Sequence, residues 1–295
     1  MKFSNLYKSA CAVGILLTAT ALSSCEKDGN PNNLPEVSTA DYEGTIGGFK
    51  TSDEILKDNL VAYFSFDDNY SEKISNTAPT QTAGNTLVDG FKGKALDLNN
   101  GYLYFASQFA AFKTDALKSF TISQWIQISN NGSKRTMLMQ LARPGTFDGS
   151  LDIRLNTNGY PASNIDVLKV GPRFSTVGGG SQDNLNATLS PKIGPGNWVH
   201  LVLSYNGKTG RFNVLANGIN IGSYSDRGVG NNLFKSNEPG ELIFGGNYNV
   251  IPGKAVNTST EYAAMTGKID EVKIYNAFMP DAVVNAMYKL YLEKK

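Results

Sequence analysis

The sequence predicts an all-β domain in which antiparallel strands form a sandwich. From Leu60 onward, short runs of alternating apolar residues recur, and clusters rich in Gly, Asn, Asp and Pro separate them. The runs have the length and composition of strands, and the "NG", "DG" and "GG" pairs between them are turn signals. Roughly 240 residues of this pattern in one block fit a single sandwich. The expected strands are LVAYFSF, GYLYFA, SFTISQWIQI, TMLMQLA, SLDIRLN, WVHLVLSY, RFNVLAN, ELIFGG and KIDEVKIY.

The N-terminus predicts a secretion signal, residues 1–24, rather than part of the domain. Lys2 and Lys8 precede the apolar run ACAVGILLTATAL, which is shorter than the roughly 20 apolar residues of a membrane-spanning helix. The sequence LSSC, ending at Cys25, follows and resembles the signal of a bacterial lipoprotein. That resemblance implies cleavage before Cys25 and a lipid on its thiol. The alternative is an ordinary secretory signal that is cut nearby.

Residues 25–56 predict a flexible tether that leads to a domain at residues 57–295. They are rich in Asn, Pro, Gly, Asp and Ser and have few apolar clusters, a composition that does not build a core. The stretch EKDGN, residues 26–30, resembles the surface-export signal of some outer-membrane lipoproteins. We therefore expect a protein that is lipid-anchored in the outer membrane and displayed on the cell surface, with the periplasmic face as the alternative.

Cysteine usage and charge exclude several kinds of site. Cys11 and Cys25 are the only cysteines, and the lipoprotein interpretation leaves no free thiol in the mature domain, so no disulfide is expected. A secreted domain without disulfides depends on a sizeable core or a bound metal. The chain has 27 basic and 26 acidic residues, and removal of Lys2 and Lys8 leaves 25 against 26. This balance predicts no basic surface for nucleic acid.

A short C-terminal helix is expected at PDAVVNAMYKLYL, residues 280–292. Pro280 suits the start of a helix, and Val283, Met287 and Leu290 recur at helical spacing on one face. No comparable helical pattern precedes it in the sequence, so the domain is all-β with one terminal helix.

Four segments of the chain resemble, in order, the segments of one family of β-sandwiches: LVAYFSFDDN with GFKGKALDLN, SFTISQWIQI, GNWVHLVLSYNGKTGRFNVLANG, and TGKIDEVKIYN with NAFMPDAVV. That family is the LamG-like branch of the concanavalin A-like jelly rolls, and the resemblance runs from about residue 58 to the C-terminus. It implies a two-sheet antiparallel jelly-roll sandwich. It says less about function, because this fold carries lectins, adhesion modules and glycoside hydrolases. Relative to the family, residues 141–195 form a loop-rich insertion, either a binding region or an elongated hairpin.

Two adjacent carboxylates, Asp270 and Glu271, interrupt the last expected strand. Neighbouring strand residues point to opposite faces, which places Asp270 with Val272 and Ile274 on the apolar face. Glu271 is then expected on the other face with Lys273. The two carboxylates are therefore not expected to act as an acid and a base on one bond.

Asp270 is expected to take part in a calcium site. A carboxylate that enters a core is costly unless it is paired, hydrogen-bonded or metal-bound. The family's first and last strands pair antiparallel, which implies that Asp67 and Asp68 lie beside Asp270, where many relatives hold a structural calcium. Converging carboxylates with turn carbonyls suit Ca2+. The alternative is that Asp270 bonds backbone amides of a turn while Asp67 and Asp68 face water.

The sequence contains no catalytic arrangement, so a protein that is not an enzyme is expected. Retaining glycosidases need two carboxylates about 5–5.5 Å apart, and the strand Glu-x-Asp-x-x-Glu or Glu-x-Asp-x-Glu of the superfamily's hydrolases does not occur. His200 is the only histidine, its strand reads as buried, and no Gly-x-Ser-x-Gly elbow exists to meet it. Trp125 and Trp198 alternate with apolar neighbours, so core packing is expected for both.

Aromatic and polar residues in the loops are the candidates for ligand binding. Loop aromatics have no evident core to serve, so they suit stacking on a pyranose ring, and arginine and amide side chains supply hydrogen bonds. Asp152 and Arg154 share a strand face as a surface ion pair or a polar ligand contact. The aromatic candidates are Phe147, Tyr160 and Tyr248, and the polar candidates are Arg154, Asn164, Arg173 and Asn247.

The expected function is that of a lipid-anchored module which binds a glycan or polysaccharide on a calcium-stabilised jelly roll. A module that binds a surface protein is the first alternative, because other LamG-like domains act in adhesion. A glycoside hydrolase is the second alternative, and the missing acidic strand counts against it.

Overall fold

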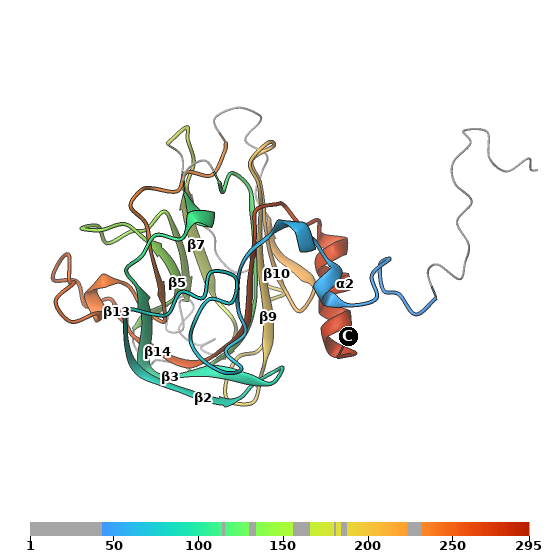
Figure 1. Ribbon diagram of the computed structural model, residues 1–295, viewed down its shortest axis with the longest axis horizontal. Coiled ribbons are helices and arrows are strands. Elements are labelled where there is room, and N and C mark those ends of the chain that lie inside the picture. The colour runs from blue at the N-terminus through green and yellow to red at the C-terminus, as the bar shows by residue number, and fades with distance from the viewer. Residues whose placement is uncertain are drawn as a thin grey trace, which may run out of the picture. The chain divides into compact units, whose positions relative to one another are not determined.

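The structure is a computed structural model that describes residues 43–113, 116–129, 134–155, 166–179, 181–183, 188–223 and 232–294 (Figure 1). The compact unit formed by these residues begins at Gly44. Cys25, the signal peptide and most of the predicted tether lie outside the described residues. Within the described ranges, no helix combines the length and the apolar character needed to cross a membrane.

One layer of the sandwich contains β1 (Leu60–Phe64), β4 (Phe120–Ile128), β9 (Val199–Asn206), β10 (Arg211–Ala216), β11 (Ile219–Ser223) and β14 (Met265–Tyr275). Neighbouring strands run antiparallel in the order β11-β10-β9-β4-β14, and β1 pairs with the second half of β14. The expected antiparallel pairing of the first and last strands is confirmed, since Phe64 lies opposite Val272.

The second layer contains β2 (Gln81–Asp89), β3 (Lys94–Phe105), β5 (Arg135–Ala142), β6 (Leu151–Leu155), β7 (Val170–Ser175), β8 (Ser181–Asp183) and β12 (Glu241–Phe244). These strands run antiparallel in the order β2-β3-β12-β5-β6-β7-β8, and the two-residue β13 (Tyr262–Ala263) joins β5 in parallel. The first half of β14 pairs with β3, so one hydrogen-bonded path of strands curls from the first layer into the second (Figure 1).

Apolar side chains that alternate along both layers meet in one core. Ile122 and Ile126 of β4 and Ile153 of β6 are buried there. Rings from distant segments also meet in it, with the centroids of Phe64 and Phe244 5.0 Å apart in an edge-to-face arrangement. Burial of such side chains contributes roughly 1.5–3 kcal/mol each. The predicted all-β sandwich is confirmed, and its two-sheet antiparallel jelly-roll arrangement follows from the strand order.

The predicted C-terminal helix is confirmed as α2 (Asp281–Leu292), which packs on the outer face of the first layer (Figure 1). Pro280 is the extended residue that precedes it. Met287 and Leu290 of α2 are buried in one apolar cluster with Trp125 of β4. This cluster, called the helix layer below, is separate from the core between the sheets.

Four short 3-10 turns complete the described elements: η2 (Ser52–Glu54), η3 (Lys57–Asn59), η4 (Ala110–Phe112) and η6 (Tyr248–Val250). Turn η2 contacts α2, and Ile55 and Leu56 belong to the helix layer. Residues 51–56, expected at the end of the tether, therefore pack against the C-terminal helix.

The last strand contains a bulge at the two adjacent carboxylates. Glu271 has φ 49°, in the left-handed region that residues other than glycine rarely adopt. The pairing of β14 with β4 shifts between Asp270 and Lys273. Asp270 lies opposite Trp125 of the helix layer, and Glu271 accepts a hydrogen bond from the hydroxyl of Tyr291 on α2. Both carboxylates therefore lie on the outer face of the layer.

The predicted alternation across this strand is wrong for Asp270. Ile269 and Val272 both point into the core, and the two residues between them are displaced outward together. A bulge adds one residue to a strand and resets its alternation. Asp270 consequently does not share the face of Val272 and Ile274, whereas Glu271 does share a face with Lys273 as predicted.

Candidate functional site

Five predicted ligand-binding residues fall within the described part of the chain, and all five lie on or beside the outer face of the second layer. On this face the side chains of β3, β12, β5, β6 and β7 alternate with those that fill the core. Tyr160 and Asn164 lie outside the described residues. The five residues are Phe147, Arg154, Arg173, Asn247 and Tyr248.

Glu241 begins β12, and two tyrosine hydroxyls hold its carboxylate. Oε2 of Glu241 accepts hydrogen bonds from Tyr104 on β3 at 2.6 Å and from Tyr248 on η6 at 2.5 Å. The two rings meet nearly at right angles with centroids 6.3 Å apart. Burial, and then the Glu241 carboxylate, raise the pKa of both tyrosines. Both hydroxyls therefore remain donors at neutral pH and fix the orientation of the carboxylate.

A pocket of about 400 Å3 opens beside Glu241. Nζ of Lys254 lies 5.1 Å from the centroid of the Tyr104 ring, a cation–π distance. The hydrogen bond to the Tyr104 hydroxyl raises the pKa of Lys254, so the ammonium stays charged. The pocket thus presents one carboxylate and one ammonium within a wall of mixed polar and apolar surface. That wall is formed by Tyr248, Pro144, Gly145, Gly253, Ala255 and Val256.

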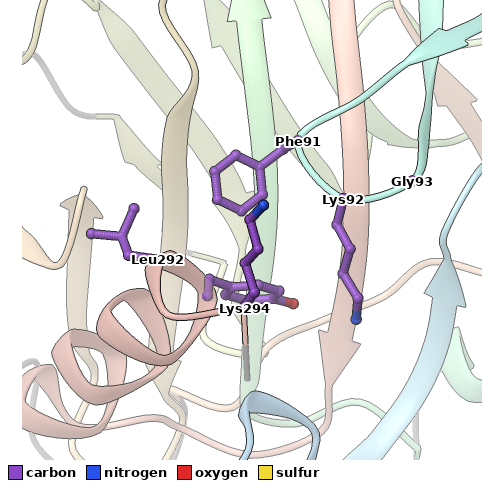
Figure 2. Close-up of a pocket in the computed structure, with 6 residues that line it drawn as sticks. Phe91, Lys92, Gly93, Leu292 and Lys294 are labelled. Carbon is purple, nitrogen blue, oxygen red and sulfur yellow. The ribbon is translucent and has the colours of Figure 1, made fainter.

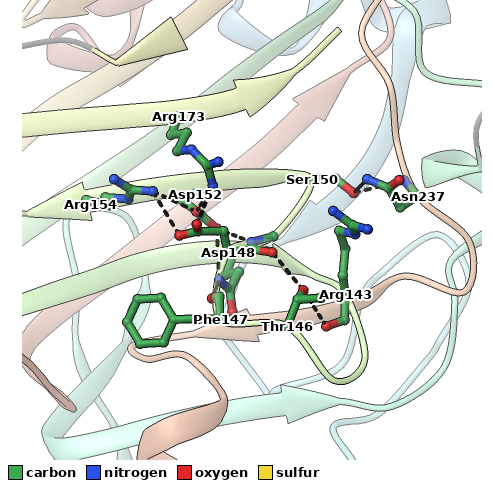
Figure 3. Close-up of polar contacts among 11 residues, drawn as sticks. Arg143, Thr146, Phe147, Asp148, Ser150, Asp152, Arg154, Arg173 and Asn237 are labelled. Carbon is green, nitrogen blue, oxygen red and sulfur yellow. Dashed lines mark hydrogen bonds and ion pairs between the residues drawn. The ribbon is translucent and has the colours of Figure 1, made fainter. Parts of the chain in front are cut away.

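Two arginines and two aspartates form a second polar group on the same face (Figure 3). Nη2 of Arg154 on β6 lies 3.2 Å from Asp148 and 3.2 Å from Asp152. Nη1 of Arg173 on β7 lies 2.8 Å from Asp148. The arginine side chains are 18% and 27% exposed, so both reach the surface. We call these four residues the arginine cluster.

Asp152 holds the arginine cluster from beneath. It is fully buried, and its Oδ1 accepts hydrogen bonds from Nε2 of Gln140 at 2.8 Å and from N–H of Gly149 at 2.9 Å. Desolvation raises its pKa, while Gln140 and Arg154 act in the opposite direction. The expected Asp152–Arg154 pair is present, but Asp152 positions the arginines instead of meeting a ligand.

The loop between β5 and β6 connects the Glu241 pocket with the arginine cluster. Pro144 and Gly145 line the pocket, and Asp148 binds both arginines. Phe147 lies between them in the chain, is partly exposed, and packs edge-on against Tyr262 with ring centroids 5.7 Å apart. The structure therefore brings Phe147, Arg154 and Arg173 together, as a shared site requires.

Asn247 and Tyr248 are more buried than their loop composition indicates. Asn247 is fully buried, and its Oδ1 accepts a hydrogen bond from N–H of Asn249 at 3.1 Å, which caps η6. Tyr248 is 2% exposed and packs with Ile251 in a small apolar cluster outside the main core. The expectation that a loop aromatic has no core to serve is wrong for Tyr248. It contributes to the pocket wall without offering an open ring face.

The three carboxylates of the predicted calcium site are only partly brought together. Asp67 and Asp270 converge on the turn between β2 and β3, where they accept hydrogen bonds from N–H of Lys94 at 3.1 Å and of Lys92 at 3.0 Å. Asp68 points away, is 76% exposed and pairs with Lys73 at 3.0 Å. Among the residues that the structure describes, no group of three or more His, Cys, Asp or Glu side chains is arranged to hold a metal ion.

One oxygen at this turn lacks a partner. Asp270 is fully buried, and its Oδ1 has no hydrogen bond within the described part of the chain. Desolvation raises the pKa of Asp270 to about 7, and the amide of Lys92 offsets this only in part. A cation or an ordered water would satisfy such an oxygen. The donors thus fit a metal at Asp270 and Asp67 but not at Asp68, and calcium binding stays a prediction.

A second pocket, of about 350 Å3, lies where the β2–β3 turn meets the end of α2 (Figure 2). Phe91 and Lys92 of the turn face Tyr291, Leu292 and the following chain. None of the five described ligand-binding candidates lines it. The flat side of Phe91 is already covered by Trp125, with ring centroids 3.4 Å apart.

His200 and Trp125 form part of the helix layer. His200 is fully buried, shares a hydrogen bond with Ser123 at 2.8 Å, and stacks on Trp125 with ring centroids 5.0 Å apart. Desolvation lowers the pKa of His200 to about 3, so it is neutral at physiological pH. Trp198 is partly buried against the same cluster. The packing roles predicted for these three residues agree with these contacts.

Three residues of the site were not anticipated from the sequence: Tyr104, Glu241 and Lys254. Strand alternation in GYLYFA would have placed Tyr102 and Tyr104 on the outer face, so that signal was available for Tyr104. Glu241 begins an otherwise apolar strand, and Lys254 stands in irregular chain. Neither has a sequence signal for convergence, because η6 and the residues after it bring the two together.

Comparisons with known proteins agree with this fold. The family model described as the concanavalin A-like lectin/glucanases superfamily matches residues 98–285, more than half of the chain. No curated protein matches the chain.

Solved structures with the same fold are similar at low sequence identity. The binding domain of Paraclostridial Mosquitocidal Protein 1 aligns with TM-score 0.57 and 18% identity over 79% of this chain and 52% of that one. Domain 4 of an extracellular arabinanase from Geobacillus stearothermophilus, in complex with arabinotriose, aligns with TM-score 0.51 and 20% identity over 78% and 98%. The binding domain of botulinum neurotoxin DC, in complex with rat synaptotagmin II, aligns with TM-score 0.52 and 13% identity over 80% and 52%. The chain spans about half the length of these two toxin domains.

Proposed function

The chain belongs to the concanavalin A-like lectin/glucanases superfamily, and from that premise we propose that it is a glycan-binding module. The observation that carries the proposal is the open pocket at Glu241, joined by one loop to the arginine cluster. Small-molecule sites are typically clefts of about 300–1,000 Å3 with a few fixed polar groups in an apolar wall. The Glu241 pocket has that size, and it offers fixed polar groups beside apolar side chains in a wall of mixed polarity.

The adjoining surface suits a ligand longer than one sugar. Arg154 and Arg173 place guanidinium groups at the surface, and Phe147 lies on the loop between them and the pocket. A chain of sugar units presents hydroxyl groups and apolar ring faces along its length, which match such a row of polar and aromatic side chains. A domain of the same fold, in the Geobacillus arabinanase, holds arabinotriose, and this supports a saccharide as the class of ligand.

A glycan array with the purified protein tests the proposal. Ala255 is an exposed residue that lines the pocket, so Ala255→Trp fills the pocket without removing a side-chain hydrogen bond. This variant should lose binding to each glycan that the original protein binds on the array. Ala110→Trp, at an exposed position on η4, is the matched control and should bind as the original protein does. Binding that survives Ala255→Trp would place the site elsewhere and remove the support for this proposal.

A protein-binding module is the second candidate. It is favoured by the botulinum neurotoxin binding domain, which shares the fold and is seen in complex with synaptotagmin. The same tryptophan variants separate the two candidates. A surface protein that binds with equal strength to Ala255→Trp, in the absence of any glycan signal, would support the second one.

We further propose that the module is not an enzyme. Within the described part of the chain, Glu241 is the only acidic residue that lines the pocket, whereas glycoside hydrolysis requires a pair of carboxylates across the scissile bond. The purified protein should therefore release no reducing sugar from a polysaccharide that it binds. Turnover that disappears in Glu241→Gln would contradict this part of the proposal.

The lipid anchor at Cys25 and display at the outer-membrane surface are proposals that rest on the signal sequence alone. Cys25→Ser removes the thiol that would carry the lipid, so the variant should lose membrane association and become soluble. Fractionation of cells that express each form measures this. A variant that still sediments with membranes would contradict the lipoprotein interpretation.

Calcium at the β2–β3 turn is proposed with a reduced set of ligands. Asp270 supplies the buried oxygen that lacks a partner, and Asp67 supplies the second carboxylate at the same turn. Ca2+ takes about 6–8 oxygen ligands, so backbone carbonyls and water would complete the site. A bound ion would satisfy Asp270 and fix the turn against β14.

A further inference from the structure

The fixed carboxylate of Glu241 affects which ligand charges the pocket can accept. We infer that the Glu241 pocket selects neutral saccharides and discriminates against those that carry a carboxylate or a sulfate. This inference rests on the proposed glycan-binding function, and it names the class of glycan. It assigns to Glu241 the role of a specificity-determining residue.

The hydrogen bonds of Glu241 leave one of its oxygens for a ligand. Both tyrosine bonds, from Tyr104 and Tyr248, end on Oε2. Within the described part of the chain, Oε1 is not a buried atom without a partner, so it is not sealed in the interior. Glu241 lines the pocket, where Oε1 can meet water or a ligand. A carboxylate oxygen only accepts hydrogen bonds, so Oε1 suits a donor such as a sugar hydroxyl. Because the tyrosines hold the other oxygen, the carboxylate cannot turn away from a ligand.

An anionic sugar would meet this carboxylate directly. Among the described residues, Lys254 is the only cation that lines the pocket, and its single charge is balanced by the single charge of Glu241. A ligand carboxylate at about 4 Å from another one experiences a repulsion that is substantial near a protein surface. Like charges placed opposite each other are a common means of rejecting a wrong partner. The pocket therefore offers an anion no net attraction.

The arginine cluster does not reverse this preference. Arg154 binds both Asp148 and Asp152, and Arg173 binds Asp148. The two guanidinium groups and the two carboxylates sum to zero, and the buried Asp152 cannot leave the cluster without losing its bonds to Gln140 and Gly149. The outward parts of the arginines can donate hydrogen bonds to hydroxyls, which a neutral sugar supplies.

Matched pairs of oligosaccharides test the inference with the purified protein. Trisaccharides of glucose, galactose and mannose are compared with those of glucuronate, galacturonate and mannuronate in low salt. The neutral member of a bound pair should bind at least about tenfold more tightly than its uronate. The difference should shrink at 1 M salt, because screening weakens repulsion between groups that face solvent.

Two variants show whether Glu241 is responsible. Glu241→Gln keeps the shape and an acceptor but removes the charge, so it should reduce the neutral-to-uronate ratio toward one. Glu261→Gln, at an exposed residue paired with Arg135 outside the pocket, is the control and should keep the original ratio. Equal or tighter uronate binding by the original protein, or an unchanged ratio in Glu241→Gln, would overturn the inference while the glycan-binding function stands. Absence of binding to every member would instead count against that function.

Discussion

Two glutamates in this protein have nearly the same partners and very different surroundings. Glu241 accepts hydrogen bonds from Tyr104 and Tyr248, and Glu271 accepts them from Tyr63 at 2.6 Å and Tyr291 at 3.3 Å. Each also lies near lysine. Glu241 faces an open pocket on the outer face of the second layer, whereas Glu271 is fully buried in the helix layer.

The lysines near Glu271 belong to the protein's own framework. Nζ of Lys273 lies 3.5 Å from Glu271 and 2.5 Å from Asp53 of η2. Lys273 is 2% exposed and lies over the rings of Tyr63 and Tyr291 at 5.1 and 5.2 Å. These partners of Glu271 thus come from several elements of the fold, and Nζ of the half-exposed Lys92 lies 3.6 Å away. The network joins η2, β1, β14 and α2.

The two glutamates differ in their access to water, and this access, more than residue type, distinguishes a binding group from a structural one. The second pocket shows the same point, because Tyr291, which lines it, donates its hydroxyl to Glu271, and Trp125 already covers one face of Phe91. An ionised group that is buried and paired is costly to disturb. An ionised group at an open pocket can exchange water for a ligand.

Replacing each glutamate separately by alanine should give the largest difference in stability between the two sites. Glu271→Ala leaves the buried Lys273 with one partner fewer and removes the acceptor of the buried Tyr291 hydroxyl and of the partly buried Tyr63 hydroxyl, so it should lower the free energy of unfolding by about 3–5 kcal/mol. Glu241→Ala should cost about 1 kcal/mol, because pocket water can bond the freed hydroxyls. Urea unfolding followed by tryptophan fluorescence measures both.

The isosteric Glu271→Gln is the control for lost packing. It keeps the volume and one acceptor, so its cost should lie between those of the two alanine variants. Equal costs for Glu271→Ala and Glu241→Ala would show that burial does not distinguish the two sites.

Chelation should have the next largest effect if Asp270 and Asp67 hold calcium. An ion that binds only the folded form stabilises it by about 2.7 kcal/mol at a hundredfold excess over its dissociation constant. EDTA should then lower the melting temperature of the original protein, and added calcium should restore it. Asp270→Ala should remove this response.

Asp68→Ala is the matched control, because Asp68 is exposed and pairs only with Lys73 among the described residues. It should respond to EDTA as the original protein does. Glu271→Ala is not a suitable control, since the bulge places Glu271 beside Asp270. A melting temperature that is indifferent to EDTA would mean that the unpaired oxygen of Asp270 is satisfied by water.

Acid should destabilise the helix layer through His200. Burial lowers its pKa to about 3 in the folded protein, whereas the unfolded chain takes up the proton near pH 6.5. The contribution of the neutral, buried His200 to the free energy of unfolding is therefore complete above pH 6.5. It is lost as the pH falls from 6.5 toward 3. At pH 5 the loss should be about 2 kcal/mol.

The variant His200→Gln isolates this effect from that of the carboxylates. Its free energy of unfolding should depend less on pH between 6.5 and 5 than that of the original protein, whatever its stability at pH 8. Parallel pH profiles for the two proteins would indicate that water reaches His200 in the folded state, and that the helix layer is more open than the Glu271 network requires.

The sequence was sufficient for the features that follow from periodicity. The nine expected strands, the face of α2 that carries Met287 and Leu290, and the pairing of β1 with β14 all depend on alternation or helical spacing. Arg154 could likewise be placed on the face that it shares with Asp152, whereas Arg173 lies on β7, which was not among the expected strands. Such features depend on which residues share a face, and that is local information.

The rest depended on information that periodicity does not contain. The bulge at Glu271 requires a left-handed residue that no glycine marked, so the face of Asp270 could not be foreseen. Tyr248 looked like a free loop aromatic because the residues that bury it, such as Ile251, follow in irregular chain. The convergence of Glu241 with Lys254 depends on the same loop. Functional sites built from loops are the part of a fold that local patterns predict least.

Removal of single hydroxyls should give the smallest effect and the finest test of the comparison. Tyr63→Phe leaves Oε1 of the buried Glu271 without this donor, and hydrogen bonds to charged groups contribute about 1.5–3 kcal/mol. Tyr104→Phe leaves Glu241 with Tyr248 and with water from the pocket, so it should cost about 1 kcal/mol or less. Both variants keep the ring, and with it the cation–π contact of the neighbouring lysine. Urea unfolding at pH 7 with equal denaturant slopes should therefore show a difference of about 1 kcal/mol between them. If Tyr104→Phe proved as costly as Tyr63→Phe, water would not reach the freed oxygen of Glu241, and the pocket would lack the access that a ligand needs.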